Sequence, residues 1–244
     1  MLRNILPFLL VSTACTSLAQ VPAVGKIRHQ AVVGYNIGAV SPIGLPATIR
    51  KIYGYSPLFA PSFGYEGLYK VKNHWMLGYG LRVDFKAMRV RDSVAYMPTI
   101  IHSGKDRLEG VFSGRNQTSV RNIYLTLPVY LQWTPAEKWH YKLGMYMAYL
   151  LRPKFEGKVS DGYIRNGGSL GEKVAIASAE FDFSARENRW DIGIHAGIAH
   201  DIAPKWAVAA QVQWGLLPVF PSSFNGVSFK MYNIFGNIGV AYSL

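Results

Sequence analysis

The side chains that could do chemistry are charged and imidazole groups that recur at every second position within apolar stretches. Arg82, Asp84 and Lys86 follow this spacing, and Asp191 and His195 lie four residues apart, on one side of an extended chain. An Asp–His pair with a serine nucleophile would make a hydrolase or acyl-transfer set. No Gly-x-Ser-x-Gly motif is present, and the spacing assigns no serine to this pair. We therefore predict that the chain has no catalytic residues and is not an enzyme.

Metal and cofactor sites have no better support in the sequence. The His residues are scattered, and only His195 and His200 come close together. Their separation of five positions puts them on opposite faces of a strand. No Gly-rich loop is followed by Lys and Ser or Thr, as a phosphate site requires. We predict no metal and no cofactor.

Several charged residues on one face are costly to bury in a dry core, because an unpaired charge loses its hydration. They are tolerated in the polar interior of a barrel, where they pair with one another. We expect a salt-bridge and hydrogen-bond network there, and no continuous aqueous pore, because a small barrel is filled by its side chains. The predicted lumen network comprises Glu66, Arg82, Asp84, Lys86, His140, Lys142, Asp191, His195 and Asp201.

The segments that would position these residues alternate with period two, as strands do when their two faces have different surroundings. There are eight: residues 29–39, 60–71, 75–91, 119–133, 139–152, 189–202, 206–217 and 231–244. Pro128 cannot donate to a ladder and predicts a bulge. Weak alternation in Lys173–Phe183, which could pair with Phe155–Ile164, leaves ten strands as the alternative.

The aromatic residues at the ends of these segments and the lengths of the connections between them indicate insertion in a membrane. Apart from the N-terminal segment, no apolar run reaches the roughly 18 residues of a membrane helix, so a membrane protein of this sequence must be a closed barrel. Aromatic residues end the apolar rows, as in an interfacial belt: Trp75, Trp133, Trp139, Trp190, Trp206, Trp214 and Tyr242. Short connections at 72–74, 134–138 and 203–205 contrast with long ones at 40–59, 92–118, 153–188 and 218–229. Outer-membrane barrels show this contrast between periplasmic turns and outer loops.

The C-terminal residues Val240–Leu244 resemble the C-terminal signal of bacterial outer-membrane barrels, with Leu244 where that signal has Phe. Together with Tyr124–Pro128, Trp139–Leu151 and Trp190–Gly197, they make the chain similar to the outer-membrane beta-barrel domain family common in Bacteroidetes, which includes the PorT-like proteins. The resemblance implies an eight-stranded antiparallel up-and-down transmembrane barrel in the cell outer membrane. A PorT-like role would imply a part in a protein secretion machine.

The N-terminal segment is typical of an export signal. Residues 1–19 combine Arg3, an apolar centre and a small-x-small site before Gln20, so we expect a signal peptide at 1–19 and the barrel domain at 20–244. Cys15, the single cysteine, leaves a lipoprotein as the alternative. If Cys15 leaves with the signal, the mature chain has no disulfide.

The formal net charge of +12 points to anionic partners. For an exported protein these are outer-membrane lipid and lipopolysaccharide rather than nucleic acid, and an envelope protein complex is a further candidate. The expected outer-loop basic surface comprises Arg89, Arg91, Lys105, Arg107, Arg115, Lys154, Lys158 and Arg165. We predict a structural or interaction role, as a scaffold, a surface for docking, or an accessory of a secretion or uptake complex. A small pore, a lipid-modifying barrel enzyme and a soluble periplasmic lipid-binding barrel are the alternatives.

Overall fold

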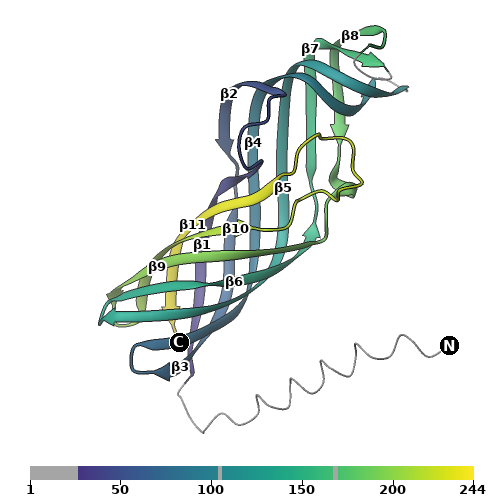
Figure 1. Ribbon diagram of the computed structural model, residues 1–244. Helices are drawn as coiled ribbons and strands as arrows, with labels where there is room; N and C mark the ends of the chain where they lie inside the picture. Colours follow the sequence, from purple (N-terminus) through teal and green to yellow (C-terminus); the bar gives the residue numbers. More distant parts are fainter. Residues whose placement is uncertain (1–26, 104–105, 167–169) are drawn as a thin grey trace, which may run out of the picture.

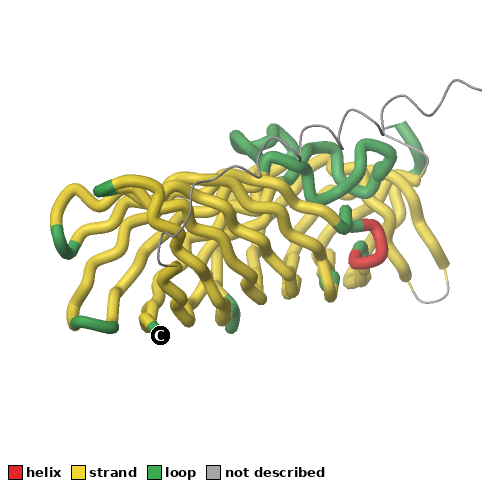
Figure 2. The backbone as a smooth tube through the Cα atoms, turned by 90° about the horizontal axis from the view of Figure 1, so that it is seen from below, coloured by secondary structure: helices red, strands yellow, loops and turns green. Residues whose placement is uncertain are grey.

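The computed structural model describes residues 27–103, 106–166 and 170–244. The expected signal peptide at 1–19 lies outside the described residues. The strands are β1 (Ile27–Ser41), β2 (Ile49–Pro57), β3 (Pro61–Lys72), β4 (Trp75–Ser103), β5 (Asp106–Ala136), β6 (Trp139–Arg152), β7 (Phe155–Asn166), β8 (Lys173–Asp182), β9 (Trp190–Ala203), β10 (Trp206–Gly215) and β11 (Tyr232–Ser243). A short 3-10 helix, η1 (Ser184–Arg186), precedes β9. Strands make up most of the described chain (Figure 2), which confirms the expected all-β antiparallel class.

The strand pairings form a circuit that returns to its start. Going round from β1, the order is β1–β3–β4–β5–β6–β9–β10–β11, and β11 pairs again with β1. Every pairing in this circuit, which we call the ring, is antiparallel. Two-residue turns at Asn73–His74, Glu137–Lys138 and Pro204–Lys205 join neighbouring strands at one end, which also holds the C-terminus (Figure 1). We call this the turn end.

Three of the four connections expected as long loops are largely strands. β4 and β5 continue as one hairpin far beyond the ring, where residues 92–118 were expected to form a loop. Residues 40–59 contain β2, which pairs with β4, and residues 153–188 contain β7 and β8. β7 pairs with β5 on one side and β8 on the other, so Phe155–Ile164 and Lys173–Phe183 form the extra hairpin that the sequence left open. This hairpin lies outside the ring, so ten strands in the ring is wrong.

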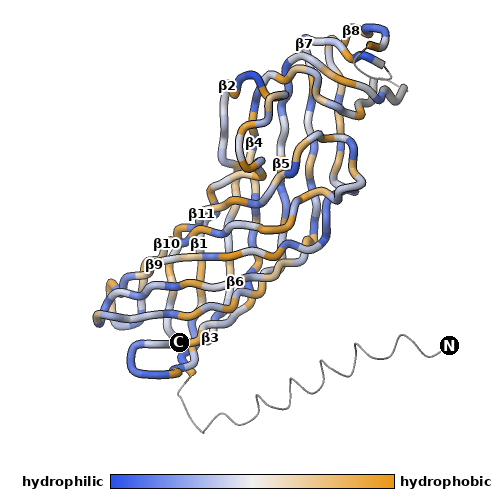
Figure 3. Tube along the Cα trace, viewed as in Figure 1, coloured by the Kyte–Doolittle hydropathy of each residue, from blue (hydrophilic) through white to orange (hydrophobic). Residues whose placement is uncertain are grey.

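The ring turns its apolar rows outward. Leu143 and Ile238 are 67% and 65% exposed, while the intervening positions of the same strands are buried or half-buried. Figure 3 shows this alternation as changes of hydropathy along the strands. A soluble lipid-binding barrel would need these rows inside, so that alternative is wrong. Among the described residues, no helix is long and apolar enough to cross a membrane.

The polarity of the two faces inverts along β4 and β5. In the first part of β4, Arg82 and Lys86 are buried while Leu81 is exposed. Further along the same strand Met88 is buried and Arg91 is exposed. On β5 the change is on the outer face, which passes from the exposed Arg115 and Arg121 to the exposed Leu127 and Val129.

The part of the sheet beyond this inversion has its own apolar core. We call it the extension; it consists of β2, Met88–Ser103 of β4, Asp106–Val120 of β5, β7 and β8. Its core includes Phe112, Val120, Phe155, Val159 and Ile164, all nearly or fully buried. The ring therefore encloses mostly polar groups, and the extension encloses a largely apolar core.

Pro128 does not cause the predicted bulge. The β4–β5 register is the same at Tyr79–Val129 as at Arg82–Thr126, on either side of Pro128. The β5–β6 register also runs through Pro128, opposite Tyr146. The missing N–H is therefore accommodated without an extra residue.

Candidate functional site

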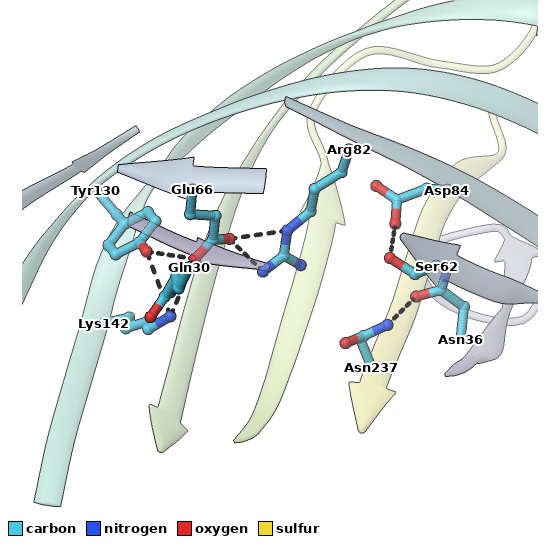
Figure 4. A network of polar contacts seen from close by, with 9 residues as sticks. All are labelled: Gln30, Asn36, Ser62, Glu66, Arg82, Asp84, Tyr130, Lys142 and Asn237. Atoms are coloured by element: carbon cyan, nitrogen blue, oxygen red, sulfur yellow. Dashed lines mark hydrogen bonds and ion pairs between the residues drawn. The ribbon is translucent and has the colours of Figure 1, made fainter. Parts of the chain in front are cut away.

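The centre of the ring is organised around the fully buried carboxylate of Glu66 on β3 (Figure 4). Arg82 Nε donates to Glu66 Oε1 at 2.9 Å, and the same guanidinium makes a second contact through Nη2. Glu66 Oε2 accepts from Gln30 Nε2 at 2.7 Å and Tyr130 Oη at 2.6 Å. Lys142 Nζ lies 3.4 Å from the same oxygen. Two cations and two neutral donors from four strands thus converge on one carboxylate.

A second cluster surrounds Asp191 on β9. Its Oδ2 accepts from Tyr146 Oη at 3.1 Å and Asn233 Nδ2 at 2.9 Å, and Lys86 Nζ lies 3.4 Å away. The fully buried Lys86 ammonium also stands 4.9 Å from the ring centroid of Tyr124, so aromatic faces replace part of its hydration. The carboxylate and its donors come from β4, β6, β9 and β11.

The buried Arg, Lys, Asp and Glu charges on the strands of the ring balance. Arg82, Lys86 and Lys142 face Glu66, Asp84 and Asp191, three cations against three anions, and all are at most 7% exposed. Between the two clusters, Ser62 Oγ donates to Asp84 Oδ1 at 2.6 Å and Asn237 Nδ2 to Asn36 Oδ1 at 2.8 Å (Figure 4). Balanced and hydrogen-bonded charges are the condition under which burial is tolerated.

Tyr130 fills the space that small neighbours leave. A Cβ on Gly78 would approach Tyr130 Cε2 to 2.3 Å, and a Cβ on Gly144 would approach Tyr130 Cβ to 2.5 Å. These inner glycines therefore make room for an aromatic ring that reaches across the interior. Large polar side chains therefore pack closely at the centre of the ring.

Of the remaining predicted lumen residues, His140 and Asp201 lie apart from these clusters, and His195 packs against Tyr130 of the Glu66 cluster. His140 Nε2 and Asp201 Oδ2 are 2.9 Å apart near the turn end, with the Asp201 side chain 35% exposed. His195 is buried, with its ring edge-on to Tyr130 at 5.4 Å. Four residues of strand separate His195 from Asp191 by about 13 Å, and the recorded donors to Asp191 are Tyr146 and Asn233. The two do not form a catalytic dyad.

Glu187 is a lumen-facing residue that the strand pattern did not identify. It lies in the connection after η1, is 6% exposed, and accepts a hydrogen bond from Asn122 Nδ2. Burial raises the pKa of Glu187 to about 7, although the hydrogen bond from Asn122 opposes this. No alternation marks a residue that enters from a loop, so the sequence carried no signal for it.

The predicted basic residues divide between one groove and scattered positions. Arg91, Arg115 and Lys158 line a groove of about 490 Å³ on the outer face of the extension, which we call the basic groove. Arg89 donates to Ser119 Oγ at 3.1 Å beside it. Lys154 pairs with Glu156 at 3.3 Å, and Arg165 donates to the carbonyl of Gly171. Lys105 lies outside the described residues, as does the side chain of Arg107.

No set of three or more His, Cys, Asp or Glu side chains in the described part of the chain could hold a metal ion.

Comparison with known proteins gives the following matches. Residues 19–221 match the model of the outer membrane protein beta-barrel domain family. Similar solved structures include Ail of Yersinia pestis, at 10% identity over 91% of this chain and 100% of that chain, with a TM-score of 0.36. Neisserial surface protein A gives 10% identity over 91% and 100%, with a TM-score of 0.34, and CarO2 of Acinetobacter baumannii gives 11% over 90% and 100%, with a TM-score of 0.38. No curated protein sequence matches the chain.

Proposed function

The chain belongs to the outer membrane protein beta-barrel domain family and is located in the outer membrane, and from this premise we propose that it is a sealed eight-stranded transmembrane anchor that holds a water-exposed interaction module outside the cell. The ring is the anchor and the extension is the module. The observation that carries this proposal is the inversion of polarity along β4 and β5. A barrel strand with apolar residues on its outward face and polar residues inside is suited to a lipid environment. A strand with polar residues outward and apolar residues inside is suited to water.

Aromatic residues mark the two edges of the proposed lipid band. At the turn end, Trp75 stacks with Trp133 at 6.2 Å and Trp206 lies 4.8 Å from Tyr242. Towards the extension, Trp190 meets Tyr149 at 4.9 Å. Amphipathic rings prefer headgroup depth, so two such belts support a membrane crossing between them. By the loop-length rule of these barrels, the turn end faces the periplasm and the extension faces outward.

The proposal assigns a sealed interior to the anchor. The clusters around Glu66 and Asp191 fill the centre of the ring with paired charges and aromatic rings. We expect purified protein in planar lipid bilayers to give no stable conductance steps under conditions in which a reference porin does. Steady channels from the purified protein would contradict the sealed interior and favour a small pore.

We also propose that the protein has no enzymatic activity. His195 is buried in the lumen against Tyr130 rather than exposed to lipid or water. A group that substrate cannot reach does not serve as a general base.

The basic groove is the part of the module proposed to bind lipopolysaccharide phosphates. Arg115 is 68% exposed at its side chain even though it lies 3.3 Å from Asp161, so it remains available to an anion. Guanidinium groups bind phosphate through paired donors, and several together strengthen the contact. A partner of a secretion or uptake complex, which the PorT-like resemblance implies, would dock on this same module.

Removing the groove charges tests this assignment. The variant with Arg91, Arg115 and Lys158 all changed to Gln should lose at least tenfold in affinity for purified lipopolysaccharide, measured with protein in nanodiscs. The matched control changes Lys70, Lys72 and Lys138, near the turn end, to Gln and removes the same total charge. Equal affinity in the two variants would show that only net charge matters and would contradict the groove.

A further inference from the structure

Where the extension meets the ring, the sheet encloses an apolar chamber. Its volume is about 420 Å³, within the range of small-molecule sites. Buried side chains from β4, β8 and the connection before β11 line it, among them Met88, Val94 and Phe181. Two further lining residues, Leu45 and Ile52, are 63% and 51% exposed, so the chamber reaches the surface beside them.

One wall of this apolar chamber is polar. Asp92, Thr99, Asn116 and Thr118 line it from β4 and β5, and each is at most 8% exposed. Asp92 and Asn116 are directly opposite in the β4–β5 register. Asn116 Nδ2 donates to Asp92 Oδ1 at 3.0 Å and to Thr118 Oγ1 at 3.2 Å. The amide donors of Asn116 are therefore used within the wall.

Two oxygen atoms of this wall are not used. Asn116 Oδ1 and Thr99 Oγ1 have no hydrogen-bond partner among the described residues. Within the same residues, Asp92 has Asn116 as its hydrogen-bond donor and no cation within ion-pair distance. A buried acceptor without a donor is destabilising. An apolar core would be more stable with apolar residues here, so the wall fits a ligand better than a purely structural role.

We propose that the chamber binds a small molecule with a hydrocarbon body and one polar end that donates hydrogen bonds, a hydroxyl or an ammonium group. The polar end lies against Asn116 Oδ1, Thr99 Oγ1 and the Asp92 carboxylate, each of which can accept a hydrogen bond. The hydrocarbon body lies among Met88, Val94 and Phe181. A carboxylate-headed molecule of the same length is disfavoured because its charge meets that of Asp92. The basic groove, which takes anions, borders this site and shares Asp92 and Asn116 with it among its lining residues.

The experiment is equilibrium dialysis of radiolabelled dodecylamine against the full-length protein in nanodiscs, with binding to empty nanodiscs subtracted. Unlabelled dodecanol and laurate then compete for the site. We expect saturable binding at one site per protein, with dodecanol competing at least tenfold better than laurate. Binding that does not exceed empty nanodiscs, or equal competition by the two molecules, would overturn the proposal.

Two variants test separately the polar wall of the chamber and its apolar lining. Asp92→Asn should lower the preference for dodecanol over laurate at least fivefold, because it removes the repelling charge. Val90→Phe, at a lining position, should weaken dodecylamine binding at least tenfold, and its matched control is Val212→Phe on the outward row of β10. Heat-modifiable gel mobility checks that each variant folds. An unchanged preference in folded Asp92→Asn, or equal binding by the two folded Phe variants, would overturn the proposal.

Discussion

Glu66 and Asp191 satisfy their buried charges by collecting donors from several strands. Each carboxylate contacts at least one cation and two neutral donors. Residue type and strand face were enough to predict that such residues lie inside, because alternation assigns each position to a side. Which donor meets which carboxylate was not predictable, because it depends on the register between neighbouring strands.

Glu187 makes the stability of the protein depend on pH. Its folded-state pKa is raised from 4.5 to about 7, chiefly by burial. The folded state therefore binds this proton more tightly than the unfolded state. Its contribution is full below about pH 4.5, falls as the pH rises towards 7, and amounts to at most about 3 kcal/mol. We expect the free energy of unfolding, measured with urea in lipid vesicles, to decline over this range.

The variant Glu187→Gln should flatten that decline, because glutamine keeps the shape and cannot ionise. Other groups titrate in the same range, so the quantity to compare is the difference between the parent and the variant. Glu137→Gln, at the exposed turn between β5 and β6, is the matched control and should leave the decline unchanged. An unaltered slope in Glu187→Gln would contradict the role of this carboxyl.

At the scale of elements, the ring strands were predictable and the extension was not. The expected segment 139–152 has the same bounds as β6, and the expected segment 206–217 begins with β10 and ends two residues after it. β4 was expected to end at Arg91 but continues to Ser103. Beyond Ala87 its outward side chains become polar and several of its inward side chains become apolar. At Tyr96 the inward face also passes from even-numbered to odd-numbered positions.

Tyr96 explains the loss of the pattern in physical terms. It has a φ of 54°, and the β4–β5 register shifts between Val94 and Met97. Its N–H donates to Ser113 Oγ at 2.9 Å. An irregularity of this kind inserts a residue and moves the inward face from even to odd positions. Period-two reasoning therefore fails across it, although both halves are strand.

The change of the outward face from polar to apolar predicts that two positions on the outward face of β5 differ in how well they tolerate a charged side chain. Leu127, in the middle of the outward row of β5, should face lipid, and Gln117 on the same face of the extension should face water. We expect Leu127→Arg to lower the free energy of unfolding by about 2–4 kcal/mol. Gln117→Arg is the matched control and should change it by about 0.5 kcal/mol or less. Similar effects of the two changes, measured in lipid vesicles, would count against a lipid boundary between them.

At the scale of the molecule, the chain combines two environments in one continuous sheet. β4 and β5 pass from the polar interior of the ring to the apolar core of the extension without a break (Figure 1). Part of the net charge of +12 lies on exposed positions of the extension, including Arg91, Arg115 and Lys158. In the proposed orientation, this continuous sheet holds the basic groove and the chamber outside the lipid band.

The central claim is that the ring lies in lipid and the extension lies in water outside the cell. Site-specific labelling of intact cells tests it, with single cysteines introduced after Cys15 is changed to Ala and a bulky, polymer-linked maleimide as the reagent. We expect Arg91→Cys and Arg115→Cys to be labelled on intact cells, and Lys138→Cys only after the outer membrane is permeabilised. Leu81→Cys and Leu127→Cys should resist labelling until the protein is unfolded. Labelling of the ring positions in intact cells, or protection of the extension positions, would contradict the account.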